Sequence, residues 1–137
     1  MAEMTRAQAE KRIRGYQSKA MGEALEMATR AELLSQGVIV HRIATPTAMR
    51  RGRRVFTAQV PGDLFGCTAD GRAVIVECKH RTDDHGHPRR PRLSDFEDHQ
   101  IDALRQWHRR GAVAIVAFFG VNRQICMFPA VMFLGEE

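Results

Sequence analysis

Residues 72–79, which read RAVIVECK, constrain the fold more than any other part of this 137-residue chain. Side chains alternate across a strand, and both faces of this segment are apolar as far as Val76. That pattern is typical of a central strand covered on both sides. Glu77 and Lys79 then follow on one face, where the strand ends. The segment therefore predicts a sheet between two layers, with two charged side chains at its edge.

The rest of the chain supplies candidate elements for those layers. A proline-free segment rich in Ala, Glu, Met and Leu predicts a helix over residues 4–36, which Gly15 or Gly22 could interrupt. Ser94 and Glu97 have capping-box spacing and predict a second helix that runs to about Arg110. Further strands are expected at 38–43, 55–60, 63–68, 112–120 and 124–129. This order favours a single α/β domain with a mixed central sheet flanked by helices.

Basic residues outnumber acidic ones. The chain has 21 Lys and Arg residues against 16 Asp and Glu residues, a formal net charge of +5. The balance favours a polyanionic partner, nucleic acid before membrane. Residues 1–20 are expected to form a basic N-terminal helix or arm, 44–54 a loop or hairpin, and 80–93 a flexible basic loop. Candidate phosphate contacts in the last two segments are Arg50, Arg51, Arg53, Arg54, Arg81, Arg89, Arg90 and Arg92.

Cysteine usage and the N-terminus bear on location. The three cysteines lack paired or metal-type spacing, which favours reduced thiols in the core. The charged N-terminal segment lacks the apolar stretch of a signal peptide, and no apolar run approaches membrane-spanning length. We therefore expect a cytoplasmic protein without a membrane partner.

The charged residues at the end of the central strand, Glu77 and Lys79, have two interpretations. In the first, Glu77 and Lys79 pair at a fraying strand end, and Asp63 is an ordinary turn residue. In the second, strands 63–68 and 72–79 form a hairpin that brings Asp63 near Glu77. Two carboxylates and the backbone carbonyl of Cys78 would then suit Mg²⁺, with Mn²⁺ as the alternative ion. A neighbouring lysine could orient water or stabilise phosphate charge, which predicts metal-assisted phosphodiester hydrolysis.

The same stretch resembles the PD-(D/E)XK nuclease motif, written here as PGD at 61–63 and ECK at 77–79. Three further segments extend the resemblance, at 22–26, 38–47 and 96–119. Together with the motif, and in the same order and at similar spacings, they resemble RecU-type Holliday junction resolvases. Archaeal-type resolvases share the helix glutamate, the motif and the downstream His-Gln.

This resemblance implies a restriction-endonuclease-like fold and a homodimeric, Mg²⁺-dependent endonuclease that resolves four-way DNA junctions by symmetric nicks. Asp63 and Glu77 would bind the metal, and Lys79 would position the nucleophilic water. Glu26 would complete the acidic cluster, and Gln100 stands at the family's His-Gln motif. A bacterial or phage source would suit so compact a version.

The chain departs from this family in two segments. Only residues 48–60 fill the place of the family's longer stalk, and residues 80–92 are more basic and richer in histidine than that loop usually is. Two other functions therefore stay open. One is a PD-(D/E)XK nuclease of the VRR-NUC type that cuts flaps or other DNA, and the other is a non-catalytic DNA-binding recombination accessory protein.

Two of the candidate residues also have spacing arguments of their own. Gln100 falls inside the apolar stripe of the predicted second helix, so its amide must find a hydrogen-bond partner near the sheet or the site. Glu26 and Arg30 have the spacing of an i, i+4 surface pair.

Overall fold

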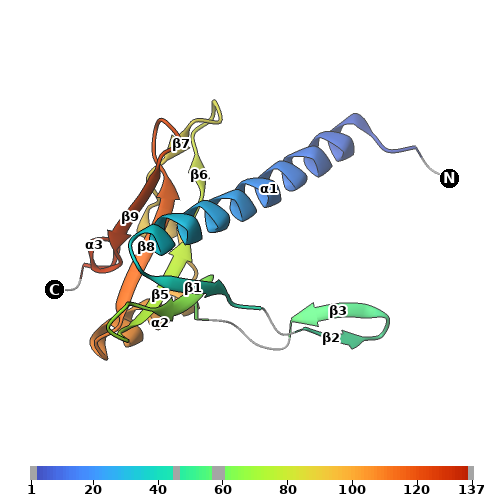
Figure 1. The fold of residues 1–137 in the computed structure, drawn as a ribbon. Coiled ribbons are helices and arrows are strands. Elements are labelled where there is room, and N and C mark those ends of the chain that lie inside the picture. Colours follow the sequence, from blue (N-terminus) through green and yellow to red (C-terminus); the bar gives the residue numbers. More distant parts are fainter. Residues whose placement is uncertain (1–2, 45–46, 57–60, 136–137) are drawn as a thin grey trace.

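The computed structural model describes residues 3–44, 47–56 and 61–135. A five-stranded sheet forms its centre, in the order β1-β4-β5-β8-β9 (Figure 1). These strands are Ile39–Arg42 (β1), Leu64–Cys67 (β4), Ala73–Cys78 (β5), Val113–Phe119 (β8) and Ile125–Pro129 (β9). β5 and β8 are parallel, and the other neighbouring pairs are antiparallel. The mixed sheet, with β5 at its centre, confirms the expected fold class.

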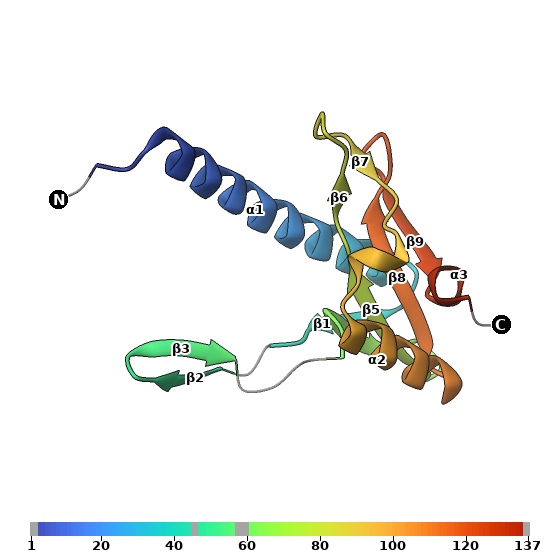
Figure 2. The same ribbon diagram turned by 180° about the vertical axis from the view of Figure 1, so that it is seen from behind.

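Helices cover both faces of the sheet. They are Arg6–Ser35 (α1), Asp98–Arg109 (α2) and Val131–Leu134 (α3). Val74 and Val76 of β5 pack with Leu33 of α1 on one face, whereas Ile75 packs with Leu104 of α2 on the other. Both views show α1 on one side of the sheet and α2 on the opposite side (Figures 1 and 2). The alternation of β5 therefore positions Glu77 on the α2 side.

α1 is continuous through both glycines that could have interrupted it. The Thr5 hydroxyl accepts a hydrogen bond from the N–H of Gln8 at 3.1 Å, which caps the first turn. Gly37 follows the helix with a φ of +79°, a left-handed conformation that favours glycine. No helix in the described part of the chain is both long and apolar enough to span a membrane.

α2 begins later than the sequence predicts. The prediction that Ser94 opens this helix was wrong, because residues Leu93–Asp95 form a separate 3-10 turn. The carboxylate of Asp95 accepts the N–H of Arg92 at 2.7 Å and closes that turn. Glu97 is the N-cap of α2, and its N–H donates to the Oε1 atom of Gln100 at 2.9 Å. The later start leaves Gln100 in the first turn, close to the end of β5.

Two arginine-bearing segments form hairpins. Thr47–Arg50 (β2) pairs with Arg53–Phe56 (β3), and Arg81–Thr82 (β6) pairs with Pro88–Arg89 (β7). The expected strand at 55–60 overlaps only the end of β3, and its residues 57–60 lie outside the described residues. Within residues 80–93, where the sequence predicts a flexible loop, β6 and β7 form a short hairpin. There the Asp83 carboxylate accepts the N–H groups of His85 and His87, both at 2.9 Å.

Candidate active site

A close backbone approach places Asp63 beside the end of β5. The N–H of Asp63 donates to the carbonyl of Val76, and the N–H of Cys78 donates to Oδ2 of Asp63, at 2.9 and 2.8 Å. A Cβ atom at Gly62 would lie 3.0 Å from the Ile75 side chain and 3.1 Å from the Val76 carbonyl oxygen. The glycine of the PGD segment therefore allows the chain to pack against β5 and hold the Asp63 carboxylate there.

Glu77 is a buried carboxyl group. The residue is 2% exposed, and its Oε1 atom accepts a hydrogen bond from Nε2 of Gln100 at 2.7 Å. Burial, followed by the charge of Asp63, raises the pKa of Glu77 to about 9, although the Lys79 ammonium partly opposes this shift. Without further positive charge, Glu77 therefore holds a proton at neutral pH.

Gln100 connects the two charged residues of the ECK segment. Its Oε1 atom accepts a hydrogen bond from Nζ of Lys79 at 3.1 Å, while its Nε2 atom donates to Glu77. The Lys79 ammonium also lies 5.4 Å from the centre of the Phe96 ring, a cation–π distance. Both side chains at the end of β5 are thus oriented by residues around the start of α2.

Glu26 approaches the site from α1. Its carboxylate forms an ion pair with Arg42 at 3.4 Å, and Arg30 donates to the carbonyl of Val40 at 3.2 Å. Glu26 and Arg30 therefore each contact β1, instead of forming the i, i+4 pair that their spacing suggests. Burial and the nearby charge of Asp63 raise the pKa of Glu26, whereas Arg42 lowers it. Glu26 thus faces the same electrostatic centre as Asp63.

The donors at the end of β5 match a small hard cation. Within the described ranges, no group of three or more His, Cys, Asp or Glu side chains is arranged to hold a metal ion. Mg²⁺, however, commonly uses only one or two carboxylates and keeps several waters. Asp63 and Glu77 each use one carboxylate oxygen in a described hydrogen bond, which leaves acceptor capacity on both. Burial raises the pKa of the Cys78 thiol, which does not favour a thiolate ligand at this position.

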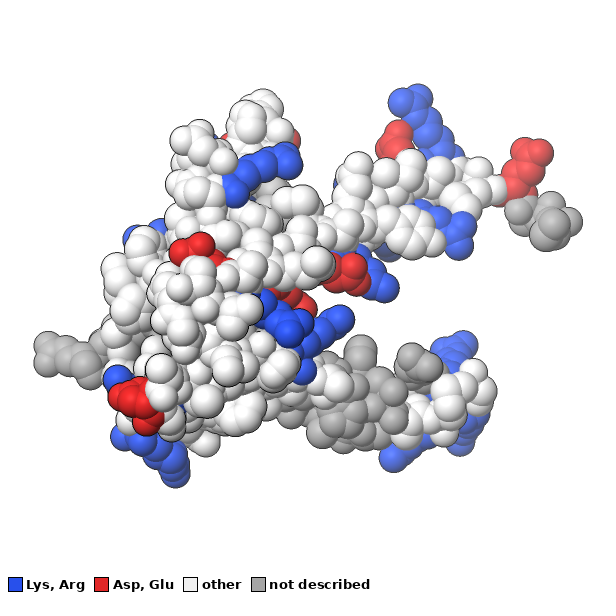
Figure 3. Space-filling model, in the orientation of Figure 1, with Lys and Arg blue, Asp and Glu red and all other residues white. Residues whose placement is uncertain are grey.

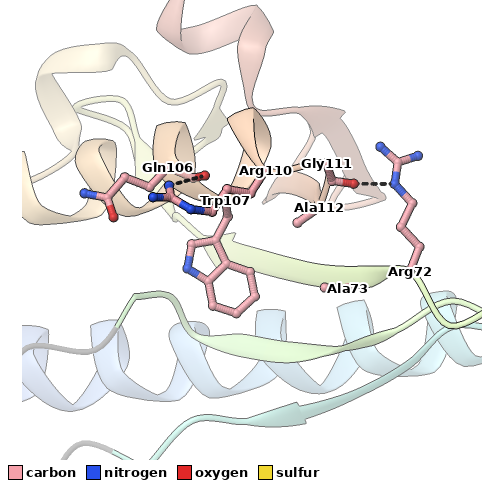
Figure 4. Close-up of a pocket in the computed structure, with 7 residues that line it drawn as sticks. All are labelled: Arg72, Ala73, Gln106, Trp107, Arg110, Gly111 and Ala112. Carbon is pink, nitrogen blue, oxygen red and sulfur yellow. Dashed lines mark hydrogen bonds between the residues drawn. The ribbon is translucent and has the colours of Figure 1, made fainter.

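A pocket at the opposite end of β5 has different chemistry. Its volume is about 600 Å³, and its lining is Arg72, Ala73, Gln106, Trp107, Arg110, Gly111 and Ala112. The Arg72 guanidinium donates to the Gly111 carbonyl at 2.6 Å, and Trp107 points away from α2 towards the sheet (Figure 4). Ala73 begins the strand that carries Glu77 near its other end, so this pocket is separate from the acidic residues.

The candidate phosphate-binding arginines differ in their surroundings. Arg50, Arg51 and Arg53 are exposed on the β2–β3 hairpin, which extends away from the sheet in both views (Figures 1 and 2). Figure 3 shows basic side chains at several places on the projecting half of α1, among acidic and uncharged ones.

The arginines of the second group have neighbours within the fold. Arg89 pairs with Asp83 at 3.0 Å, and both Arg81 and Arg92 lie 3.9 Å from Asp95. The Arg90 guanidinium lies over the rings of Phe128 and Phe133. Internal pairing therefore distinguishes this group from the exposed arginines of the β2–β3 hairpin.

Sequence reasoning missed three residues that shape the site. Gly62 could have been read from the PGD segment as a close-approach position. Phe96 lies in the segment predicted as the second helix, and its contact with Lys79 has no local signal in the sequence. The role of Arg42 as the ion-pair partner of Glu26 has no local signal, because 16 positions separate the two residues.

Comparisons with known proteins support the fold. No protein-family model matches the chain, and no curated protein sequence matches it either. Among solved structures it is similar to Hjc from Archaeoglobus fulgidus, described as a Holliday junction resolvase from an archaeal hyperthermophile. The TM-score is 0.55 at 20% sequence identity, over 81% of this chain and 78% of that chain. The five-stranded mixed sheet and its flanking helices therefore form a resolvase-like, restriction-endonuclease-like fold.

Proposed function

We propose that the protein is a metal-dependent endonuclease that resolves four-way DNA junctions. The observation that carries this proposal is the arrangement at the end of β5, where Gln100 connects Glu77 to Lys79 and Asp63 lies against the same strand end. A structural pair at a fraying strand end would not require a buried carboxyl group. The fold of this protein is similar to that of a known Holliday junction resolvase, which supports four-way DNA junctions as the substrate class.

Each residue has a distinct part in the proposed chemistry. Asp63, Glu77 and the Cys78 carbonyl would hold the cation, Mg²⁺ or alternatively Mn²⁺. When bound, such an ion lowers the pKa of water and offsets charge on the phosphate. Lys79 uses one described hydrogen bond on Gln100 and keeps donors to orient water or contact a phosphate oxygen. Gln100 acts as a positioning residue.

Glu26 is proposed to act around this centre rather than as a direct ligand. Its carboxylate pairs with Arg42, and its charge is coupled to that of Asp63. It would complete the acidic cluster through a bridging water. The ion pair with Arg42 keeps its carboxylate near the metal-binding residues while limiting the repulsion among three acidic groups.

The DNA-binding surface is proposed to include the β2–β3 hairpin. Arg51 and Gly52 both have positive φ values, 51° and 74°, as in a two-residue hairpin turn. An arginine at the first position places a positive charge at the very tip. Together with Arg50, Arg53 and Arg54, it would contact junction phosphates in the place of the longer RecU-type stalk. Arg81, Arg89, Arg90 and Arg92 form a second proposed set, which must exchange internal partners for phosphate.

Symmetric cleavage needs two active sites, so the acting species is proposed to be a homodimer. The RecU-type assignment stays a prediction, since the structural similarity reported above is to an archaeal resolvase. The test below also has an outcome for each alternative function. These are a nuclease of the VRR-NUC type and an accessory protein that binds DNA without cleaving it.

The test compares cleavage of end-labelled four-way junctions with that of matched linear duplexes, in Mg²⁺ or EDTA. Wild type and Glu77→Gln are assayed together, with DNA binding measured for both. Paired nicks in the junction, lost in EDTA and reduced by roughly 10²-fold or more in the variant, are expected. Equal cutting of linear DNA would favour the general nuclease. Binding by wild type without cleavage would favour the accessory protein.

A further inference from the structure

An exposed apolar stripe runs along α1. Its large members are Ile13, Tyr16, Met27 and Leu34, with exposed fractions of 55%, 65%, 72% and 64%. Four alanines occupy the positions between and beside them, at Ala9, Ala20, Ala24 and Ala31. At about 100° per residue, all eight positions fall within an arc of about 80°. The stripe is therefore one continuous face of the helix.

This stripe does not belong to the core. The buried residues of α1 are Leu25, Thr29 and Leu33. Helical geometry places their centre about 180° around the helix from the centre of the stripe. α1 is thus apolar on two opposite sides, and the sheet covers only one of them. Continuous exposed apolar surfaces of this kind mark sites of protein association.

Part of β1 extends the stripe sideways. A groove of about 400 Å³ lies between α1 and β1, and its lining includes Met27, Ala31, Leu34 and Ile39. Ile39 is itself 53% exposed. The C-terminal half of the stripe therefore borders a hollow that can receive large side chains from another helix.

The N-terminal half of α1 extends away from the sheet in both views (Figures 1 and 2). Every residue from 10 to 20 is exposed. A helical segment of this length is marginal by itself in water. Packing of its apolar side against another helix would stabilise it.

The charges on α1 indicate what that other helix is. Residues 6–20 carry five basic side chains and one acidic side chain, whereas residues 21–35 carry three acidic and one basic. Antiparallel pairing of two such helices sets the basic half of each against the acidic half of the other. It also opposes their macrodipoles. A second copy of the same chain therefore supplies the complementary surface.

We propose that the protein dimerises through antiparallel pairing of α1 with α1 of a second copy. The two-fold axis crosses the middle of the helix, where Ala20 and Ala24 permit close approach. Ile13 and Tyr16 of each copy pack against Met27, Leu34 and the adjoining groove of the other. This proposal rests on the proposed function only because the α1 contact would be the interface of the homodimer proposed there. It does not depend on catalytic activity.

The first test is sedimentation equilibrium of the full chain without DNA. Wild type is expected to sediment as a dimer at micromolar concentration. Met27→Arg and Ile13→Arg are each expected to raise the dissociation constant by at least about 30-fold. Met132→Arg is the matched control, because Met132 is 53% exposed on α3, away from the stripe, and should leave the dimer intact. A monomeric wild type, or stripe variants that dimerise as wild type does, would overturn the proposal.

A second test determines the orientation of the helices. Ala9→Cys and Ala31→Cys are prepared separately in a background in which the exposed Cys67 is replaced by Ser. After the two variants are mixed, a short bifunctional thiol reagent is expected to join position 9 of one copy to position 31 of the other. Efficient 9–9 and 31–31 products without the mixed product would show a parallel pair and overturn the antiparallel arrangement.

The two proposals fail in different ways. A dimer that depends on the stripe but cleaves no junction would overturn the proposed activity and leave the α1 contact intact. A wild type that is monomeric without DNA but still makes paired nicks in junctions would overturn the α1 contact and leave the proposed activity intact. Circular dichroism of each variant checks that the exposed substitutions leave the fold unchanged.

Discussion

The side-chain amide of Gln100 donates to the buried carboxyl group of Glu77 at 2.7 Å and accepts from the ammonium of Lys79 at 3.1 Å. One neutral residue of α2 thus fixes the relative positions of two charged residues of β5. Removing this amide should disturb the positions of both Glu77 and Lys79 without introducing a charge.

Gln100→Ala is accordingly expected to lower the rate of junction cleavage by roughly 10- to 100-fold, as for other groups that orient metal ligands. DNA affinity should change little, so the loss should appear in single-turnover rates with saturating enzyme. The apparent Mg²⁺ requirement should rise, which a purely structural role would not predict. His99→Ala is the control on the same helix, because the ion pair that His99 makes is with the exposed Glu97. Equal rates for Gln100→Ala and wild type would contradict this role.

Lys79→Met is expected to abolish measurable cleavage while leaving the protein folded. The methionine keeps a long unbranched side chain but removes the three N–H donors of the ammonium, which lies over the Phe96 ring. Junction binding should persist, because the β2–β3 hairpin supplies the proposed phosphate contacts. Single-turnover cleavage and a filter-binding titration on the same preparation test these two expectations. Cleavage by Lys79→Met at the wild-type rate would show that the ammonium has no part in the reaction.

The contribution of Glu77 to the stability of the metal-free protein should fall as the pH rises. The pKa of Glu77 is raised from an ordinary value of 4.5 to about 9 in the folded chain. Below pH 4.5 the folded and unfolded states both hold this proton. Between 4.5 and about 9 only the folded state keeps it, so the contribution of this group to the free energy of unfolding falls as the pH rises through this range.

Urea unfolding in EDTA across this pH range measures the effect. Glu77→Gln mimics the protonated carboxyl group, so its free energy of unfolding should lack this part of the decline and should exceed that of wild type at pH 8. Glu23→Gln, at an exposed carboxyl on α1, should retain the wild-type slope. A wild-type slope in Glu77→Gln would show that Glu77 is not the responsible group.

Replacing Arg50, Arg51, Arg53 and Arg54 with alanine should weaken junction binding and flatten its dependence on salt. Each lost phosphate contact lowers the slope of log affinity against log salt by about one unit. Replacing the same four residues with lysine keeps the charges and should preserve most of that slope. Binding titrations from low to moderate salt distinguish the two variants. An unchanged slope in the alanine variant would exclude this hairpin from the DNA-binding surface.

The sequence by itself determined the central strand, its charged end and the neighbourhood of Asp63. These features follow from local rules, because alternation sets the faces of β5 and the short turn at 69–71 sets its pairing with β4. Helical periodicity also directed Gln100 inward. The N-terminal helix and the general order of strands followed from composition and pattern in the same way, whereas the structure decided that Gly15 and Gly22 do not interrupt α1.

Only the tertiary structure decided the partners of these side chains. The N-cap of α2 is Glu97 rather than the predicted Ser94, because Asp95 closes a separate turn before it. The hydrogen bonds of Asp83 hold the turn of the short hairpin within residues 80–93. Glu26 pairs with Arg42 rather than Arg30 because α1 lies across β1. Such contacts join segments that packing alone brings together, so no local pattern encodes them. The burial that raises the pKa of Glu77 likewise requires all the layers to be in place.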